Sequence, residues 1–326
     1  MNLLILSAGT RDKVVQYFKQ NMQPEDRVIA TDCSNVAPAV YEADVFYLVP
    51  RMTAPGYIEK ILEICEKEHV DGVFSLIDPE LSLLAKERDR FLAIGTTPIV
   101  SSYELCEMCL DKFRMYQKLC EMQIPTGKCF VDKELFKAAV AKGEITFPVF
   151  VKPARGSASI NINKVNSMKE IDLLFELYDG LMIQEFMDGQ EYGADVYIDL
   201  LSGKCTSIFV KKKSKMRAGE TDKSVSVKEE ALFSMIRNFV EACGFRGMID
   251  IDIFKIDGIY YLSEVNPRFG GGYPHAYEAG VNMPEQVLMN LKGEENPVTI
   301  GDYEEGICMM KYNEVMIRRI PEADIV

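Results

Sequence analysis

Short apolar runs alternate with helical patterns along the first hundred residues. The apolar runs are Leu3–Ser7, Arg27–Thr31, Val45–Val49, Gly72–Leu76 and Pro98–Val100. Runs this apolar predict strands that are buried on both faces, as in parallel sheets. The segments between them carry helical periodicity at Lys13–Asn21, Tyr57–Glu68 and Pro79–Phe91. This alternation predicts an α/β domain over residues 1–102, built on a doubly wound parallel sheet.

The next region changes from alternating units to a compact α+β pattern. Residues 103–122 read as one helix-like stretch that contains Asp111 and Lys112. From Thr126 to about Phe186 the order is strand, helix, strand, loop, strand, helix, strand. We therefore expect a linking helix and a small lobe over residues 103–186.

A third region is predicted over residues 187–326. Tyr192–Leu200 and Lys204–Lys211 read as paired strands across a Ser-Gly turn, and a basic loop is expected at Lys212–Ser224. A helix near Val227–Cys243, a hairpin, and a Gly-rich loop with a further helix follow. The last dozen residues carry no strong pattern.

Composition and charge exclude several classes of protein. The net charge of −13 and pI near 4.9 argue against a nucleic-acid-binding surface. No apolar run approaches the roughly 20 residues that span a bilayer, and the N-terminus lacks a signal-peptide pattern, so we expect a cytoplasmic protein without a membrane partner. The basic run Lys211–Arg217 is interpreted as a solvated face, and the CxxC pair Cys106 and Cys109 as ordinary helix packing.

The hairpin between Asp252 and Asn266 is the most informative stretch, and Asp257-Gly258 is its turn signal. A two-residue turn would place Asp252 and Glu264 on opposite faces. We therefore expect a three-residue loop that pairs Lys255 with Ile259 and has Gly258 at positive φ. One face then carries residues 250, 252, 262, 264 and 266, and the core face carries Ile249, Ile251, Ile253, Ile259, Tyr261 and Val265.

This register predicts a metal–phosphate site. The oxygens of Asp252, Glu264 and Asn266 are the hard ligands that Mg²⁺ prefers, and Arg268 suits phosphate or carboxylate oxygens. The alternative is that these acids are merely exposed on a strand.

A second candidate site lies about 100 residues upstream. Phe147–Lys152 reads as a buried strand that ends in a small-residue loop with Gly156 and the serines that follow. Exposed loop amides and a lysine at a strand end can hold phosphate oxygens, although the P-loop pattern is absent. The strand Leu181–Glu185 can offer backbone groups to an adenine edge, and Glu191 can accept from ribose hydroxyls; an ordinary strand with a surface Glu remains the alternative.

The turn after the first strand, Ser7–Arg11, lies where dinucleotide-binding folds hold the pyrophosphate. Only Gly9 of the G-x-G-x-x-G pattern is present, which argues against NAD binding. A small anion at the N-terminus of the following helix remains compatible with this turn.

With these motifs, the chain resembles the ATP-grasp superfamily. More closely, it resembles short-form relatives of the carbamoyl-phosphate synthase large subunit, which have a single ATP-grasp domain. The resemblance covers nearly the whole chain and rests on Asp111-Lys112, Val151-Lys152-Pro153, Gln184-Glu185-Phe186 and the segment Glu264–Arg268. It implies a pre-ATP-grasp, Rossmann-like domain at residues 1–102, a small ATP-grasp lobe within residues 103–186 and a C-terminal lobe at residues 187–326. ATP would lie between the two lobes.

The resemblance also implies roles for individual residues. ATP would be held by Lys112, Lys152, Ser157, Ala158, Ser159, Gln184, Glu185, Phe186, Met187 and Glu191. Asp252, Glu264 and Asn266 would bind Mg²⁺, usually as two ions, with Mn²⁺ as an alternative. Arg268 would stabilise an acyl-phosphate, with Lys152 and Arg217 completing the catalytic set.

The implied activity is an ATP- and Mg²⁺-dependent ligase that phosphorylates a carboxylate and joins it to an amine or ammonia, with an amino acid as a participant. The alternatives are carbamoyl-phosphate synthase-like activity on bicarbonate and carbamate, and a catalytically silent nucleotide-binding subunit. Around Arg217 the chain departs from the synthase pattern, which puts bicarbonate in doubt. His275 is assigned either to the acceptor site or to a helix cap. The expected partners are small molecules, without nucleic acid, and a homodimer is left open.

Overall fold

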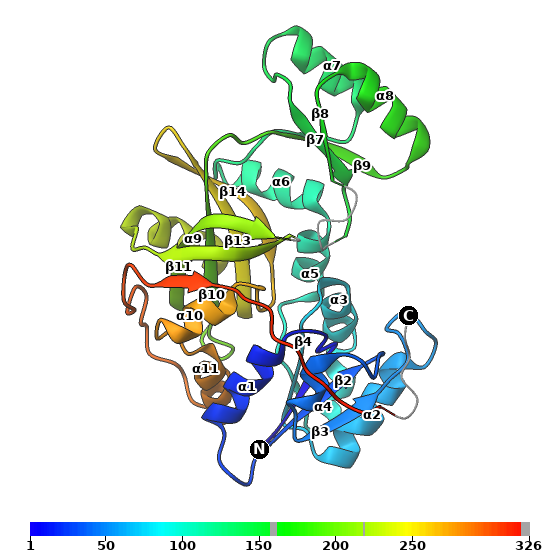
Figure 1. Cartoon of the computed structure of the whole chain (residues 1–326), viewed down its shortest axis with the longest axis vertical. Coiled ribbons are helices and arrows are strands. Elements are labelled where there is room, and N and C mark those ends of the chain that lie inside the picture. Colours follow the sequence, from blue (N-terminus) through cyan, green and yellow to red (C-terminus); the bar gives the residue numbers. More distant parts are fainter. Residues whose placement is uncertain (157–161, 218, 321–326) are drawn as a thin grey trace.

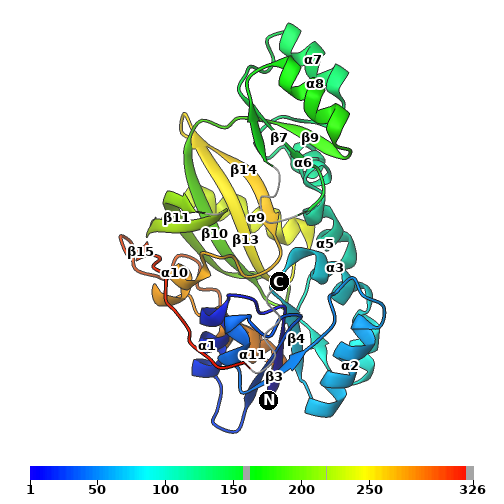
Figure 2. The same ribbon diagram turned by 45° about the vertical axis from the view of Figure 1, so that its right-hand side comes forward.

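Three sheets form in the described part of the chain. The computed structural model describes residues 1–156, 162–217 and 219–320. In Figure 1 the first sheet lies at the bottom, the large sheet in the middle and the small sheet at the top. Helices α5 and α6 run between the first and the small sheets (Figure 2). No helix among the described residues is long and apolar enough to cross a membrane.

The first sheet confirms the predicted doubly wound topology. Its strands are parallel in the order β3 (Val45–Leu48), β2 (Arg27–Asp32), β1 (Asn2–Leu6), β4 (Gly72–Ser75) and β5 (Thr97–Pro98). Its helical elements are α1 (Asp12–Asn21), the 3₁₀ turn η1 (Pro38–Tyr41), α2 (Tyr57–Glu68), α3 (Asp78–Lys86) and α4 (Arg88–Ala93). Leu3 and Ile5 point into the core with α1, while Leu4 and Leu6 point into the core with α2. The strands are therefore apolar throughout because both faces are covered.

Two predicted helices each divide in two. The helix expected at Pro79–Phe91 is α3 and α4, and the stretch 103–122 is α5 (Tyr103–Leu110) and α6 (Lys112–Glu121). Asp111 is the N-cap of α6, because its Oδ1 accepts from the N–H groups of Phe113 and Arg114 at 3.1 Å. An aspartate cap begins a new helix, so the apolar periodicity alone was insufficient to find the break.

The small lobe has the predicted order of elements. Its antiparallel sheet has the order β6 (Cys129–Phe130), β9 (Leu181–Glu185), β7 (Val149–Pro153) and β8 (Asn163–Val165). Helices α7 (Lys133–Ala141) and α8 (Met168–Leu177) bring Phe136 and Ile171 against Val149 and Val151 in a separate core.

The large sheet is antiparallel and carries most of the candidate metal ligands. Its order is β14 (Ile259–Asn266), β13 (Gly247–Ile256), β10 (Gln190–Ile198), β11 (Cys205–Arg217), β12 (Glu220–Ser226) and β15 (Cys308–Met310). Helices α9 (Glu230–Cys243), α10 (Tyr273–Glu278) and α11 (Met283–Leu291) accompany it. The loop expected at Lys212–Ser224 is wrong: most of this stretch belongs to β11 and β12, whose residues pair from Lys211 with Ser226 to Arg217 with Glu220.

The hairpin register differs from the expected one near its turn. Ile256 pairs with Ile259 across a two-residue turn in which both Asp257 (φ 49°) and Gly258 (φ 83°) have positive φ. Two positive φ values are typical of a type I′ turn. Gly258 was predicted correctly, whereas the three-residue loop and the pairing of Lys255 with Ile259 were wrong.

A β-bulge at Ser263 then restores the predicted convergence. The pairing passes from Ile253–Leu262 to Asp252–Glu264, so Ser263 is the extra residue. Before the bulge, Leu262 is fully buried and Ile259 is exposed, the reverse of the expected faces. Beyond the bulge, Asp252 lies opposite Glu264 and Asp250 opposite Asn266. The bulge therefore places Asp252 and Glu264 on the same face, which is the effect expected from the three-residue loop.

The side chain of His275 does not cap a helix and is buried in the large lobe. It lies within α10, where its Nδ1 is 2.8 Å from Ser224 Oγ and its Nε2 is 2.9 Å from the Ile307 carbonyl oxygen. Burial lowers the pKa of His275 from 6.5 to about 4. It is a buried, neutral histidine of the large lobe.

We predict a pH-dependent contribution of His275 to stability. Between pH 6.5 and 4 the unfolded chain binds a proton at this position and the folded chain does not. The free energy of unfolding should therefore fall as the pH is lowered through this window, by about 1–3 kcal/mol from this residue. Urea unfolding of wild type and His275→Gln at several pH values measures the difference, which should be lost in the variant. The exposed His69, replaced by Asn, is the control and should leave the slope unchanged.

Candidate active site

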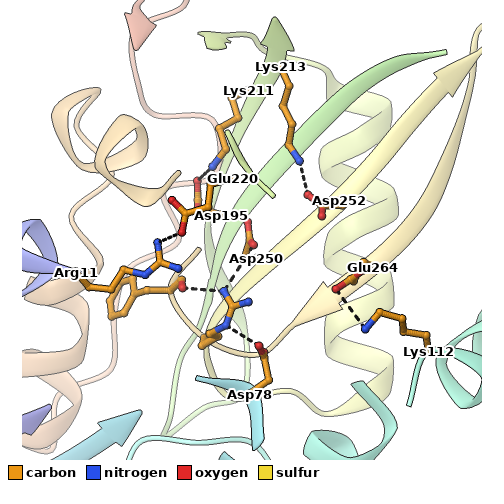
Figure 3. Close-up of polar contacts among 12 residues, drawn as sticks. Arg11, Asp78, Lys112, Asp195, Lys211, Lys213, Glu220, Asp250, Asp252 and Glu264 are labelled. Carbon is orange, nitrogen blue, oxygen red and sulfur yellow. Dashed lines mark hydrogen bonds and ion pairs between the residues drawn. The ribbon is translucent and has the colours of Figure 1, made fainter. Parts of the chain in front are cut away.

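Charged side chains from distant segments line one cavity of about 200 Å³. The walls come from the turn after β1, the start of α3, the β11–β12 hairpin, the ends of β13 and β14, and the Gly-rich loop after β14. The charged lining residues are Arg11, Asp78, Lys213, Glu220, Asp250, Asp252, Glu264 and Arg268. Figure 3 shows these side chains converging from the first sheet's segments and the large sheet.

Arg268 is held at the base of this cavity by two carboxylates. Its Nε is 3.0 Å from Asp78 Oδ2, and its Nη1 is 3.9 Å from Asp250 Oδ2 (Figure 3). Burial disfavours the charge, but Asp78 and Asp250 outweigh it and raise the pKa of Arg268. The guanidinium is therefore a fixed positive charge, oriented from both sides of the domain boundary.

Lys213 joins two more carboxylates. Its Nζ is 2.8 Å from Glu191 Oε1 and also contacts Asp252 Oδ1. The lysine side chain is 4% exposed. Although burial disfavours its charge, Asp252 and Glu191 hold the pKa of Lys213 above its ordinary value. Glu191, proposed for the ribose, thus lies beside the candidate metal ligand Asp252.

Asp252, Glu264 and Asn266 lie together at the cavity, as the hairpin argument required. Within the described residues, no group of three His, Cys, Asp or Glu side chains is arranged to hold a metal ion. Burial and the nearby Asp252 raise the pKa of Asp250 to about 7. The candidate set combines the carboxylates of Asp252 and Glu264 with the amide oxygen of Asn266, and these oxygen donors are of the kind that suits a divalent cation.

The two candidate phosphate-binding lysines lie close to the same acids. Lys112 Nζ is 3.7 Å from Glu264 Oε1 and also donates to the Gly156 carbonyl oxygen. Burial lowers the pKa of Lys152, with Glu264 acting against that change and Lys112 adding to it. The structure therefore brings Lys112, Lys152 and Glu264 together from three separate elements. Ser157, Ala158 and Ser159 lie outside the described residues.

The residues expected to border adenine lie at the C-terminal end of β9, an interior strand of the small sheet, and directly after it. Gln184 is buried within β9. The Glu185 N–H donates to the Lys128 carbonyl oxygen at 2.8 Å, and Glu185 Oε2 accepts from the Lys128 N–H at 2.9 Å. Phe186 lies under Lys164, 3.9 Å from Nζ to the ring centre, and Met187 packs against Gly127. The cavity above is not lined by any of these four residues, so their nucleotide role stays a prediction.

Arg217 lies near the cavity without lining it in the described part of the chain. Its side chain is 50% exposed, and its Nε is 3.1 Å from Asp222 Oδ1. Arg11 is the guanidinium that reaches the cavity from the opposite side, where its Nη1 is 2.7 Å from Glu220 Oε1.

The three consecutive glycines after β14 let charged groups approach the backbone. A Cβ atom at Gly270 would lie 2.5 Å from Asp250, one at Gly271 would lie 2.5 Å from Arg11 Nη1, and one at Gly272 would lie 2.9 Å from Lys211 Nζ. These distances exclude any side chain without displacement of a charged partner. The glycine run is therefore part of the site's architecture.

Sequence reasoning gave Asp78 and Lys213 no part in this site, and it placed Asp250 on the face of the metal ligands and Arg11 in a turn compatible with an anion without assigning either a role. Lys213 had a usable signal, because Lys211 and Lys213 are buried and Lys212 is exposed, the alternation of a strand. Asp78 had none, and the turn signal at Arg11 did not indicate its partner, because only the tertiary fold brings these segments against the large sheet.

Comparisons with known proteins agree with this architecture. The ATP-grasp domain model matches residues 109–272, just over half of the chain, and the model described as PylC-like, N-terminal domain, matches residues 3–99. The carbamoyl phosphate synthase arginine-specific large chain of Geobacillus stearothermophilus is 23% identical over 79% of this chain. The chain spans only about a quarter (26%) of that relative's length.

Two further matches place the chain among related folds. The D-alanine–D-alanine ligase of Pseudomonas entomophila is 27% identical over 50% of this chain and 56% of its own. A crystal structure of the biotin carboxylase domain of the Hydrogenobacter thermophilus 2-oxoglutarate carboxylase, with MgADP, ADP and bicarbonate, has a TM-score of 0.73. It is 15% identical and covers 94% of this chain and 73% of that chain, a likeness of fold.

We predict that Lys213→Met destabilises the protein because it leaves Asp252 and Glu191 without their shared cation. Loss of one partner of a fully buried pair costs about 3–5 kcal/mol, and these carboxylates are partly exposed, so we expect roughly 1–3 kcal/mol. Urea unfolding measures the loss. The matched control, Lys212→Met at the exposed neighbour, should stay within about 0.5 kcal/mol of wild type. Equal losses in both variants would contradict the role given to Lys213.

Proposed function

Because the chain belongs to the ATP-grasp family, we propose that it is an ATP- and Mg²⁺-dependent ligase. It would phosphorylate a carboxylate to an acyl-phosphate and join the acyl group to an amine or ammonia. The observation that carries this proposal is the convergence of Asp252, Glu264 and Asn266 with Arg268 at one cavity, beside Lys112. The name of the D-alanine–D-alanine ligase relative supports an amino acid as a participant.

The chain's own residues would bind and orient the reactants. Mg²⁺ held by Asp252, Glu264 and Asn266, as one or two ions, would neutralise charge on the transferred phosphoryl group. Lys112 and Lys152 would hold ATP phosphates from the small-lobe side. Arg268, fixed by Asp78 and Asp250, would stabilise the negative charge that develops on the acyl-phosphate. Phosphoryl transfer would need no general base from the described site residues, because positioning and charge stabilisation dominate the catalysis of such reactions.

A second candidate function is carbamoyl-phosphate synthase-like activity. The match to the Geobacillus large chain favours it. A third is a nucleotide-binding subunit without catalysis, against which the complete Asp, Glu, Asn and Arg set argues. In each case the proposed partners are small molecules, the proposed location is the cytoplasm, and a homodimer remains open.

Release of ADP and phosphate from ATP separates these functions. Purified protein with MgCl₂ and ATP is supplied with pooled amino acids, and separately with bicarbonate and ammonia. Turnover that requires a particular amino acid establishes the ligase, and turnover with bicarbonate and ammonia alone establishes the second function. ATP binding without turnover in any pool would reject both enzymes in favour of the silent subunit.

We predict that Glu264→Gln reduces Mg²⁺-dependent ATP turnover by about 10²-fold or more, because an amide replaces a charged metal ligand. Thermal unfolding should show an intact fold, since Glu264 is only half-buried. The exposed Glu295, replaced by Gln, is the control and should keep wild-type turnover. Wild-type turnover in Glu264→Gln would remove Glu264 from the metal site.

We also predict that Lys152→Met weakens ATP binding by about 10- to 100-fold. The reason is that hydrogen bonds from a charged donor contribute roughly 1.5–3 kcal/mol. Titration calorimetry with ATP and with adenosine measures the change, and adenosine affinity should be unaltered because Lys152 would contact only phosphates. An equal loss for both ligands would indicate a purely structural lysine.

A further inference from the structure

The segment that follows β7 is joined by its backbone to the junction between α5 and α6. The Lys112 N–H donates to the Ala154 carbonyl oxygen at 2.8 Å, and the Gly156 N–H donates to the Leu110 carbonyl oxygen at 3.0 Å. These two hydrogen bonds form an isolated antiparallel β-bridge. This joint, between residues 110–112 and 154–156, holds the end of the small lobe's β7 against the linking helices.

A side-chain ion pair crosses the same joint. Arg155, which lies opposite Asp111 in the bridge, places its Nη2 2.9 Å from Glu107 Oε1 and 2.7 Å from Glu107 Oε2. Glu107 lies on α5, about one helical turn before Asp111. Burial disfavours the charge of Glu107, but Ser82 and Arg155 outweigh burial and lower the pKa of Glu107. Glu107 is therefore ionised at neutral pH, where it pairs with Arg155.

Helix α5 is a fixed reference for this ion pair because it packs on two sides. Cys106 is buried in the core of the first domain, and Cys109 is buried in the core that continues into the large sheet. Just before the helix, Ser101 Oγ donates to the Arg246 carbonyl oxygen at 3.1 Å and accepts from the Arg246 N–H at 3.0 Å. The small lobe has a core of its own, so the joint contributes to fixing its position relative to the large lobe.

The two lysines proposed to hold ATP phosphates lie on opposite sides of the joint. Lys112 begins α6, whereas Lys152 lies on β7, shortly before Arg155. Lys112 Nζ also donates to the Gly156 carbonyl oxygen and lies 3.7 Å from Glu264 Oε1 (Figure 3). A shift of β7 at the joint would therefore change the separation of the two ammonium groups.

A cavity of about 410 Å³ lies beside the ion pair. Its lining includes Glu107, Leu110, Arg155 and Gly156. Because open space adjoins the pair, loss of the ion pair would leave room for the joint to shift. The Arg155 side chain is 51% exposed, and exposed ion pairs contribute little to overall stability. The pair is therefore better suited to orienting the joint than to stabilising the fold.

We propose that Arg155 is a positioning residue, which through Glu107 fixes the separation of Lys112 and Lys152 and so prepares both lysines for the phosphates of ATP. This inference rests on the proposed function, because it takes these two lysines as the ones that hold ATP phosphates. Arg155 would act without touching the nucleotide. Charges that are already in place bind a ligand more tightly, because less ordering remains to be done on binding.

Titration calorimetry with ATP and with adenosine tests this role without requiring turnover. Arg155→Met and Glu107→Gln should each weaken ATP binding by about three- to tenfold, because each removes the side-chain contact across the joint. Adenosine binding should stay unchanged in both variants, since adenosine carries no phosphate. The double variant should bind ATP about as weakly as either single variant, because both substitutions remove one shared interaction.

An exchange of the two charges separates positioning from direct contact with the nucleotide. Arg155→Glu alone should bind ATP most weakly, because two carboxylates then face each other, and adding Glu107→Arg should restore binding to within about threefold of wild type. Lys133→Met is the matched control, because it breaks an exposed ion pair with Asp172 that lies within the small lobe and does not cross the joint. It should bind ATP as wild type does. Unliganded unfolding temperatures of all variants should stay close to that of wild type, since the ion pair is exposed.

The proposal is overturned if Glu107→Gln binds ATP as wild type does, if the two losses add in the double variant, or if adenosine binding falls together with ATP binding. Its failure is distinct from failure of the ligase. ATP binding that depends on the ion pair, without turnover in any substrate pool, would uphold this role and reject the enzyme. Turnover with an unchanged KM for ATP in both single variants would uphold the enzyme and reject this role.

Discussion

Pairing of buried charges is the constraint on which the rest of this structure depends. Removing a charged group from water is costly unless an opposite charge and hydrogen bonds compensate for it. Arg268 has Asp78 and Asp250, and Lys213 has Glu191 and Asp252. These carboxylates come from the start of α3 in the first domain and from β10 and β13 of the large sheet, so their positions depend on the whole fold. A slip of one residue in β14 would send Glu264 and Asn266 to the opposite face and break this pattern.

Positive and negative side chains are not evenly distributed along the cavity, and this uneven distribution bears on which ligands it can bind. Around the candidate metal ligands the carboxylates of Asp250, Asp252 and Glu264 gather at the cavity. Around Glu220 the cations predominate. One cavity thus has a region that favours a metal cation and a region that favours an anion. A reaction that brings together a Mg-bound phosphate and a charged acceptor needs such a separation of charge.

Local patterns in the sequence were sufficient to predict much of the fold. The first sheet and the small lobe were predicted because buried strands and their periodic helices leave clear signals at residues such as Leu3–Leu6 and Val149–Val151. The convergence of Asp252 and Glu264 was predicted correctly for a partly wrong reason. Asp257-Gly258 was read as a longer loop, and Ser263 gave no sign that it is a bulge. Bulges depend on cross-strand packing, which one strand's sequence does not reveal.

The basic run Lys211–Arg217 shows a second reason why the sequence alone did not predict the site. Five cations in seven residues resemble a solvated face, yet Lys211 and Lys213 are buried because acids on β10 and β13 lie opposite them. Their role depends on distant partners, as do the roles of Arg11 and Asp78.

The contact of Asp78 with Arg268 also limits which N-terminal domains could replace the one in this protein. One apolar core continues from β1 and α1 into the large sheet, and Tyr17 of α1 stacks on Tyr277 of α10 with ring centres 3.7 Å apart. The segment that resembles an independent nucleotide-binding module therefore completes the charge balance of the catalytic lobe. An isolated catalytic lobe would carry Arg268 and an uncovered apolar face into solvent. Grafting a different N-terminal module onto this lobe would succeed only if the donor brought an acid at the position of Asp78 to pair with Arg268.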